Sequence, residues 1–406
     1  MTMTKQQKNI IVLLYLALIA ICIAGMILCN WSKSATLVAI LSFTSIVAAS
    51  LLISWGAETA QFMISQGLAV AIIAILQVLP EFFVEAVIAW SKNVSLMLAN
   101  FTGSNRLLMG LGWPSIFFIY YYAHCLKYKK KPARDIRLKE SHVLEVLALL
   151  FGCLYFIKIL LTNQVTLFDS FVFLTIFVYY FWALSKLPPE HEENMKDLLA
   201  PPRLLAENKN KKLRSIYVLL LFVISGVTLV FVAHPFLKSM EHISIAMGIS
   251  TFLFVQWVAP FLTEFPEKLT SYYWASRIKL APMGLLNMIS SSVNQWTLLI
   301  AMIPIVYSLS CRSVMYIPLD THLNHEVLLT VIMTFYGVVC LSKFKLTRAN
   351  AMVIFSLWLL QFLVSDARLY TAAAFLFFTL VEIIIHYKDI TIINAAKNVF
   401  GQIYKK

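Results

Sequence analysis

The stretch Thr263-Glu264-Phe265-Pro266-Glu267-Lys268-Leu269-Thr270-Ser271 lies within an apolar segment, 245–275, that is long enough to cross a bilayer. Two carboxylates flank its proline, although an ionisable group at membrane depth costs about 2.5–3.5 kcal/mol on insertion scales. Pro266 has no N–H, so the carbonyl of Leu262 loses its helical partner. A broken helix with free carbonyls and two acids is typical of a cation site.

A second version of this element lies in the first half of the chain, as Gln77-Val78-Leu79-Pro80-Glu81-Phe82-Phe83-Val84-Glu85. Pro80 frees the carbonyl of Leu76 in the same way. Two such elements, one in each half, indicate a transporter built from internal repeats.

The composition excludes a soluble globular domain. The 406 residues are 60% hydrophobic and 13% charged, and the mean hydropathy is +0.79. The net charge of +13 lies in loops, so it indicates topology and no nucleic-acid partner. No phosphate-binding Gly-rich loop, zinc-protease motif or nucleophile elbow is present, so we expect no nucleotide, no cofactor and no enzymatic activity.

The sequence predicts an all-α polytopic membrane protein of about twelve transmembrane helices. Apolar spans fall near 10–29, 36–64, 68–91, 94–122, 142–162, 166–186, 215–236, 245–275, 281–308, 326–342, 349–365 and 367–387. The predicted parts are an extra helix in 1–35, a first repeat in 36–186, a linker in 187–214, a second repeat in 215–365, and an extra helix with a tail in 366–406.

The basic loops orient these spans. The loop from Lys127 to Lys139 is strongly basic, and the central linker and both termini also carry lysine, which places all of them in the cytoplasm. Each repeat has five spans, so the second enters from the opposite side and the repeats are inverted. We expect the protein to lie in the plasma membrane of a prokaryote, where its partners are the lipid bilayer and inorganic cations. The sequence leaves open whether it forms a homodimer.

Polar residues open the span that follows each proline–glutamate element. They are Asn100-Phe101-Thr102-Gly103-Ser104-Asn105 in the first repeat and Asn287-Met288-Ile289-Ser290-Ser291-Ser292 in the second. With Leu79-Pro80-Glu81 and Phe265-Pro266-Glu267, these residues resemble the signatures of the calcium/cation antiporter superfamily, whose best-known members are the sodium/calcium exchangers.

The resemblance implies that Glu81 and Glu267 are the central cation ligands, with carbonyls near Leu76 and Leu262. The other implied ligands are Thr263, Glu264, Ser104, Ser291, Asn105 and Gln77, and the supporting residues are Asn100, Asn287, Glu85, Gln295, Pro80, Pro266, Lys268 and Arg106. Two facing carboxylates neutralise a divalent ion, and hydroxyls and carbonyls suit calcium, which takes six to eight oxygens. Without the ion the acids repel each other, which makes proton exchange available to the same site.

Departures from the family pattern bear on the coupling ion. Gln77-Val78 replaces Thr-Ser, Glu264 replaces Ser, and Glu85 stands where a hydroxyl is usual. Several hydroxyls that would bind sodium are therefore missing, so proton coupling or an altered ion choice fits better than the usual sodium coupling. We interpret the chain as an exchanger of calcium, or another divalent cation, for protons or sodium. The alternatives are a sodium/proton exchanger and a transport-inactive membrane sensor or scaffold. In the latter, ion pairs of Glu264 with Lys268, and of Glu85 with Arg106, would replace the transported ion.

Overall fold

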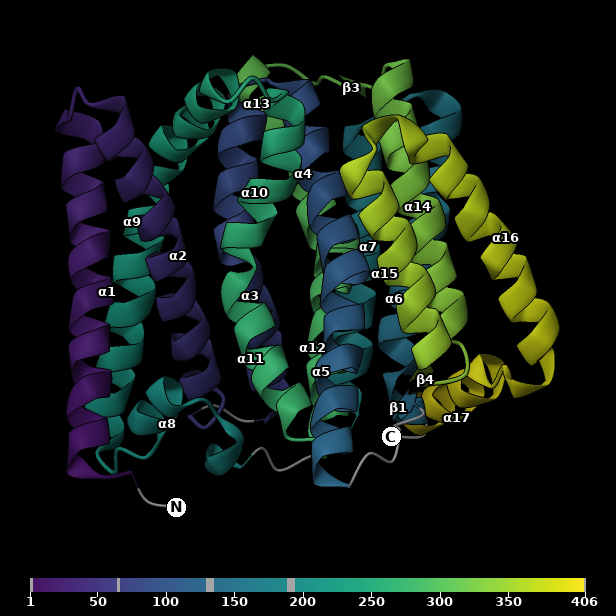
Figure 1. Cartoon of the computed structure of the whole chain (residues 1–406), viewed down its shortest axis with the longest axis horizontal. Helices are drawn as coiled ribbons and strands as arrows, with labels where there is room; N and C mark the ends of the chain where they lie inside the picture. The colour runs from purple at the N-terminus through teal and green to yellow at the C-terminus, as the bar shows by residue number, and fades with distance from the viewer. Residues whose placement is uncertain (1–2, 64–65, 129–134, 188–193, 405–406) are drawn as a thin grey trace. The chain divides into compact units, whose positions relative to one another are not determined.

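The computed structural model describes residues 3–63, 66–128, 135–187 and 194–404, without the side chains of residues 66–75, 77 and 365 (Figure 1). Its α-helices are α1 Lys5–Trp31, α2 Ala35–Ala60, α3 Gln66–Trp90, α4 Val94–Leu107, α5 Trp113–Lys127, α6 Val143–Thr162, α7 Leu167–Lys186, α8 Ala200–Ala206, α9 Lys211–Ala246, α10 Thr251–Thr263, α11 Phe265–Ser276, α12 Ala281–Asn294, α13 Ile300–Cys311, α14 Thr321–Leu341, α15 Arg348–Leu363, α16 Arg368–His386 and α17 Ile392–Tyr404.

Short elements join these helices. Two are π-helices, η1 Leu108–Gly112 and η4 Gln295–Leu299, and four are 3-10 turns, η2 Glu140–His142, η3 Met195–Asp197, η5 Ser365–Ala367 and η6 Tyr387–Asp389. The strands are β1 Asp135–Arg137, β2 Gln164–Val165, β3 Ile317–Pro318 and β4 Lys345–Thr347.

Long apolar helices dominate the fold, as predicted. Within the described residues, eight helical segments are long and apolar enough to cross a membrane, and α10 and α15 are shorter apolar helices. The chain forms two compact units, of which unit 1 comprises 1–88 and 188–270 and unit 2 comprises 89–187 and 271–406. Each unit therefore draws on both predicted repeats.

In unit 1, α1, α2 and α9 lie side by side (Figure 1). A side chain at Gly25 of α1 would meet the Ser45 hydroxyl of α2, so the missing side chain allows this close approach. The Ser45 hydroxyl donates to the Ile21 carbonyl at 3.0 Å, and the rings of Tyr15 and Trp55 pack edge to face at 5.3 Å. Small residues and hydroxyls thus hold these helices together.

The predicted break beside Pro266 is present. Thr263 ends α10, Phe265 begins α11, and the Glu264 N–H between them donates to the Pro260 carbonyl at 3.0 Å. The first-half element differs, because α3 continues through Pro80 from Gln66 to Trp90. A single proline removes one hydrogen bond, and the surrounding turns can carry the helix past it.

Unit 2 contains two elements of equal construction. The fourteen residues of α4 run into the five-residue π-helix η1, and the fourteen residues of α12 run into the five-residue π-helix η4. Single-turn π-helices are rare and occur frequently at functional sites. Both lie directly after the Asn- and Ser-rich segments singled out from the sequence.

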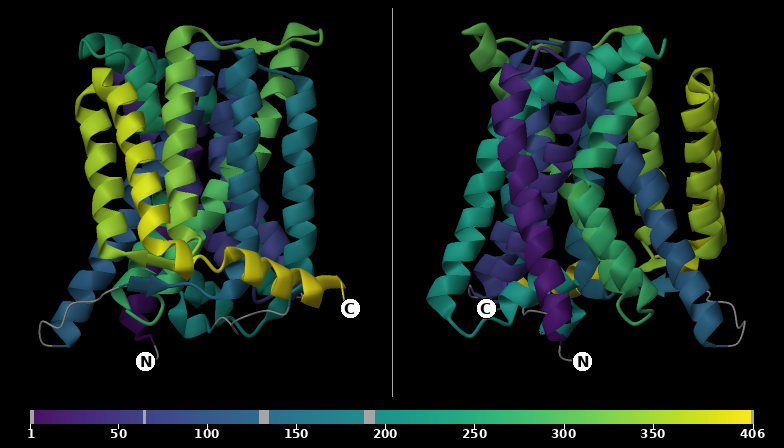
Figure 2. Two further views of the ribbon diagram at one scale, coloured as in Figure 1. Left: turned by 90° about the vertical axis from the view of Figure 1, so that its right-hand side faces the viewer. Right: turned by 60° about the vertical axis from the view of Figure 1, so that its left-hand side comes forward.

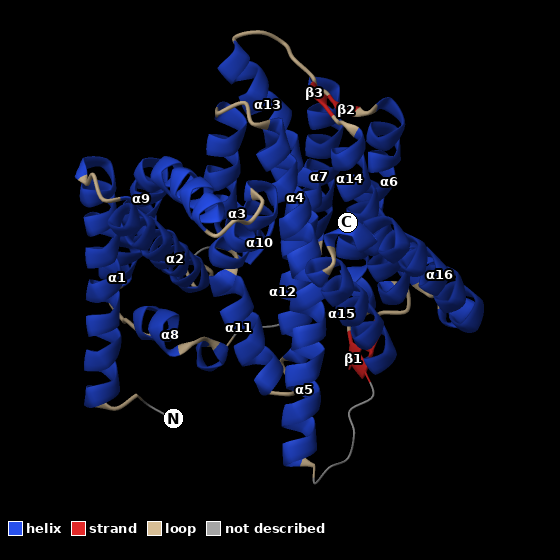
Figure 3. Ribbon diagram, turned by 45° about the horizontal axis from the view of Figure 1, so that its top comes forward, coloured by secondary structure: helices blue, strands red, loops and turns tan. Residues whose placement is uncertain are grey.

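Two short strand pairs join the 89–187 part of unit 2 to its 271–406 part, one pair at each end of the unit (Figure 3). β1 pairs antiparallel with β4, and β2 pairs antiparallel with β3. Asn163 and Phe344 both take left-handed φ angles, 51° and 49°. The Asn163 carbonyl accepts from Leu319 N–H and the Phe344 carbonyl from Leu138 N–H, each at 2.8 Å. The two strand pairs mark the β1–β4 end and the β2–β3 end of unit 2.

The helices after these strands begin alike. Thr166 and Asp169 form a capping box at the start of α7, and Thr347 and Asn350 form one at the start of α15. Beyond them, α16 packs on α14, and α17 lies across the end of α6 (Figure 2). Helix α17, the strands and the π-helices were not among the elements predicted from the sequence.

Candidate functional site

The two central acids of the prediction both belong to unit 1. Glu81 lies in α3 and Glu267 in the first turn of α11, and they are 5% and 7% exposed. α3 and the α10–α11 pair lie side by side in Figures 1 and 3. Buried carboxylates require a partner or an ion. Unit 1 therefore holds two such groups, each directly after a proline.

Thr263 is the last residue of α10 and is also buried. Its hydroxyl donates to the Ala259 carbonyl at 3.1 Å. A hydroxyl that donates its hydrogen keeps lone pairs for a cation, as the predicted role requires.

The Lys268 ammonium pairs with the Glu264 carboxylate one turn away, and both side chains are buried. This is one of the structural ion pairs that the sequence left open. Since Glu264 supplies the counter-charge for Lys268, Lys268 adds no net positive charge beside Glu267.

Glu58 of α2 is an acid that sequence reasoning left out of the candidate set. Its Oε1 accepts from the Thr270 hydroxyl of α11 at 2.8 Å. Glu58 is buried and thereby ties α2 to the helix that carries Glu267. The signal that could have found it is an acid inside an apolar span, the same signal that identified Glu81.

The polar ligands and supporting residues predicted on the third span of each repeat belong to unit 2. Asn100, Ser104 and Asn105 are buried in α4, Ser291 is buried in α12, and Gln295 is buried at the start of η4. The Asn105 amide donates to the Phe101 carbonyl at 2.9 Å, while its buried Oδ1 accepts no hydrogen bond within the described part of the chain.

Asn287 of α12 has a structural role. Its amide donates to the Ser271 hydroxyl of α11 at 3.0 Å and so bonds one helix to the next. Glu85 is fully buried in unit 1, and the side chain of Gln77 lies outside the described residues. The ligand role of Gln77 and the supporting roles of Asn287 and Glu85 stay predictions.

Arg106 is engaged by a carboxylate that the sequence analysis did not name. Its guanidinium pairs with Glu326 of α14 and donates to Gln361 of α15 at 2.8 Å. Arg368, the first residue of α16, places its Nε 2.5 Å from Glu326. Arg106 lies more than two hundred positions from each of these residues along the chain, so no local pattern predicts its contacts. The proposed pairing of Arg106 with Glu85 stays a prediction.

The candidate ligands offer carboxylate, hydroxyl and amide oxygens, which suit a hard cation. The described residues contain no group of three or more His, Cys, Asp or Glu side chains that could hold a metal. A divalent ion would need hydroxyl, amide and carbonyl oxygens beside the two acids, as calcium accepts.

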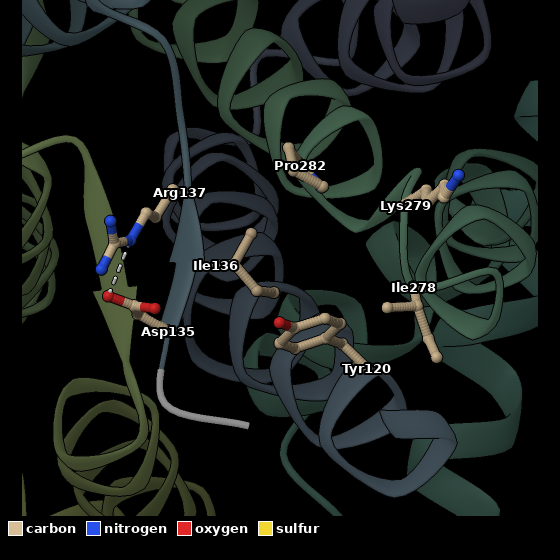
Figure 4. Close-up of a pocket in the computed structure, with 7 residues that line it drawn as sticks. All are labelled: Tyr120, Asp135, Ile136, Arg137, Ile278, Lys279 and Pro282. Carbon is tan, nitrogen blue, oxygen red and sulfur yellow. Dashed lines mark hydrogen bonds and ion pairs between the residues drawn. The ribbon is translucent and has the colours of Figure 1, made fainter. Parts of the chain in front are cut away.

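A cavity of about 340 Å³ lies at the β1–β4 end of unit 2 (Figure 4). Ile136 points toward Tyr120 and Pro282, whereas Asp135 and Arg137 lie on the other side of the strand and bond to each other at 3.2 Å. None of the predicted ligands lines it.

Buried acids that follow prolines in apolar helices are typical of membrane proteins that transport cations, and this is the class that the fold and the site indicate. A family model described as sodium/calcium exchanger protein matches residues 33–186 and 217–367. The chain belongs to this family.

The chain resembles solved structures of known exchangers. The crystal structure of the H+/Ca2+ exchanger CAX is 31% identical, covers 98% of this chain and 100% of its own, and superposes with a TM-score of 0.88. The sodium-calcium exchanger NCX_Mj is 20% identical, with coverage of 81% and 98% and a TM-score of 0.53, which shows the fold alone. No curated protein matched significantly.

Proposed function

We propose that the protein is a secondary antiporter that exchanges calcium, or another divalent cation, for protons by alternating access. The observation that carries this is the pair of buried acids in unit 1, Glu81 and Glu267, each directly after a proline. Both would bind the cation, with the Thr263 hydroxyl and backbone carbonyls beside them. Glu264 is the weaker candidate ligand because it already holds Lys268.

Two observations support protons rather than sodium as the coupling ion. The relative with 31% identity over the whole chain is named an H+/Ca2+ exchanger. The chain also lacks hydroxyls at Val78, Glu264 and Glu85, where the family pattern has Ser or Thr for sodium. Two acids that share one site take up protons when the divalent ion leaves, which provides the exchange.

We further propose twelve spans with a five-plus-five inverted repeat and both termini in the cytoplasm. The equal lengths of α4–η1 and α12–η4 support the repeat. So does the exchange of strands, because a two-fold axis between the halves would convert the β1–β4 pair into the β3–β2 pair. The basic loops support the orientation.

The test is calcium flux in proteoliposomes with proton, sodium and calcium gradients imposed one at a time. We expect calcium uptake to follow the proton gradient and to be indifferent to sodium. Glu81→Gln and Glu267→Gln should each reduce uptake at least about tenfold, since each removes one negative charge from the ion. The matched control is Glu207→Gln, at an exposed glutamate. Sodium-driven uptake would contradict proton coupling, and unchanged flux in both variants would remove the two acids from the mechanism.

A further inference from the structure

A second cavity, the α6–α7 cavity, has a volume of about 210 Å³ and lies between α6, α7 and α17 of unit 2. None of the candidate cation ligands lines it. Its walls are aliphatic and aromatic side chains, among them Phe151 of α6, Ile176 of α7 and Phe400 of α17. Thr175 also lines it, but its hydroxyl donates to the Phe171 carbonyl at 2.8 Å. An apolar ligand suits these walls.

The α6–α7 cavity reaches the surface of two membrane-crossing helices. Helix α7, and α6 together with η2, are each long and apolar enough to cross a membrane. Two of the lining residues, Phe151 and Tyr179, are 54% and 45% exposed. In a membrane protein an exposed apolar surface of this kind meets the acyl chains of the bilayer. A lipid chain can therefore enter the cavity from the side.

The cavity is elongated along the helices. Its lining residues on α7 run from Thr175 to Ala183, which corresponds to a rise of about 12 Å. Those on α6 run from Leu144 to Phe151, a rise of about 10 Å. The hydrocarbon of one leaflet is about 15 Å thick, half of the bilayer core. A single acyl chain that lies parallel to the two helices matches this length.

Helix α17 closes the cavity at the β1–β4 end. It runs crosswise to α6 and α7 at the bottom of the left view in Figure 2, and it contacts α6 and η2. Its buried residues are Ala395, Val399 and Ile403, four residues apart, so one face packs on the protein. The ring of Phe400 lies 6.4 Å from that of Tyr179 in α7. An amphipathic helix in this position lies in the plane of the membrane interface.

An aromatic cluster marks the depth of that interface. The hydroxyls of Tyr179 and Tyr404 are 3.1 Å apart, and the rings of Trp182 and Tyr404 have their centroids 6.0 Å apart. Tryptophan and tyrosine collect at the level of the lipid head groups in membrane proteins. The cluster therefore places the head groups beside α17, and the cavity extends from there into the hydrocarbon.

Basic side chains surround this end of the cavity. Lys397 is exposed and lies one turn before the lining residue Phe400, on the same face of α17. The sequence of α17 has no Asp or Glu. Lys186, the last residue of α7, is also exposed, and the exposed acid of η2, Glu140, directly follows the exposed Lys139. A negative head group is attracted to such a surface.

We propose that the α6–α7 cavity binds one acyl chain of an anionic phospholipid whose head group pairs with Lys397. Apolar burial of the chain provides affinity, and the ammonium group provides the preference for a negative head group. The bound lipid fills the space between α6 and α7 and fixes α17 to the membrane surface. The proposal depends neither on the coupling ion nor on the cation ligands.

The experiment is native mass spectrometry of the full-length protein in detergent, titrated with phosphatidylglycerol or with phosphatidylcholine of the same acyl chains. We expect phosphatidylglycerol to bind about fivefold more tightly, as one lysine near the lipid surface provides. Lys397→Gln should abolish this preference, whereas the matched control Lys388→Gln, at an exposed lysine of η6, should keep it. Glycerol phosphate, which has no acyl chain, should not compete. Equal affinity for both lipids in the wild type would overturn the proposal.

A second variant tests the cavity itself. Ala148 of α6 is a buried lining residue, and leucine there would occupy part of the space. Ala148→Leu should weaken the binding of both lipids at least about tenfold, because it displaces methylene groups of the chain from apolar contact. Ala373→Leu, at an exposed alanine of α16, is the matched control and should bind both lipids like wild type. Unchanged binding in Ala148→Leu would overturn the proposed site.

Photo-cross-linking locates the lipid in the wild type, so it does not depend on the folding of a variant. A phosphatidylglycerol with a diazirine in its acyl chain should label α6 and α7, and unlabelled phosphatidylglycerol should compete. Competed labelling that is confined to other helices would overturn the proposal. A wild-type oligomer that Ala148→Leu dissociates without changing lipid binding would overturn it too, because a second copy of the chain would then occupy the cavity.

Discussion

Arg368 begins α16, and its Nε lies 2.5 Å from Oε1 of Glu326 in α14. The match to the family model ends at residue 367, so this guanidinium comes from outside the matched region. At the far end of α16, Glu382 pairs with the buried Lys343, and its other oxygen accepts from Asn350 at 3.0 Å. The helix is therefore fixed at both ends to charged groups of the exchanger fold and belongs to unit 2.

Removal of Glu326 should destabilise the protein far more than removal of Arg368. Glu326→Gln leaves Arg106, 1% exposed, without its carboxylate, and such a loss costs about 3–5 kcal/mol. Arg368→Gln removes a partly exposed cation while Arg106 still balances Glu326, so about 1 kcal/mol or less is expected. Thermal unfolding of the purified protein in detergent measures both.

The double variant Arg106→Met/Glu326→Leu provides the control. Replacement of both buried charges by apolar groups should recover most of the stability lost in Glu326→Gln. Equal losses in Glu326→Gln and Arg368→Gln would contradict the assignment of Glu326 as the carboxylate that neutralises Arg106.

We expect Lys268 to stabilise the protein as the counter-charge of Glu264 and to make no contact with the transported ion. Lys268→Met leaves a buried carboxylate uncompensated and should lower stability by about 3–5 kcal/mol. Glu264→Gln/Lys268→Met removes both charges and should restore stability together with calcium affinity, measured by equilibrium binding. If the double variant folds well but has lost calcium binding, Glu264 is itself a ligand.

Much of the fold could be predicted because long apolar segments carry a strong signal. The break beside Pro266 and the pairing of Glu264 with Lys268 depend on neighbours in the sequence, so local rules reach them. The same proline rule does not tell a broken helix from the continuous α3, because the outcome at Pro80 depends on packing around the helix.

The contacts of Arg106 show where sequence reasoning stops. Its carboxylate, Glu326, comes from a distant helix, and only the folded structure brings the two together. The strand pairs have two or three residues each, too few for an alternating pattern. The candidate acids Glu81 and Glu267 could be found because a buried charge is unusual at membrane depth, whereas ligands among common Asn and Ser residues have no such signal.

Gly284 should tolerate no side chain. A Cβ at Gly284 of α12 would lie 2.7 Å from the Ser271 carbonyl oxygen of α11, and a backbone atom cannot move aside alone. Gly284→Ala should therefore lower the unfolding temperature and weaken the nearby bond from Asn287 to Ser271. Gly226→Ala in α9 is the matched control, since nothing lies within 4 Å of its Cβ position. It should gain about 0.5–1 kcal/mol from helix propensity. A loss at Gly226 equal to that at Gly284 would count against the close approach.

The turns that follow α3 and α11 should gain stability from glycine. Lys92 and Ile278 have φ angles of 63° and 49°, which an L-residue adopts at a cost of about 1–2 kcal/mol. Ile278 is the more strained because its side chain is β-branched. Ile278→Gly and Lys92→Gly should raise the unfolding free energy by up to about 1 kcal/mol, measured by thermal unfolding in detergent. Lys279→Gly, at an exposed neighbour outside the positive-φ region, should lose about 0.5–1 kcal/mol through the greater freedom of the unfolded chain. The same loss in all three variants would show that the left-handed turns store no strain.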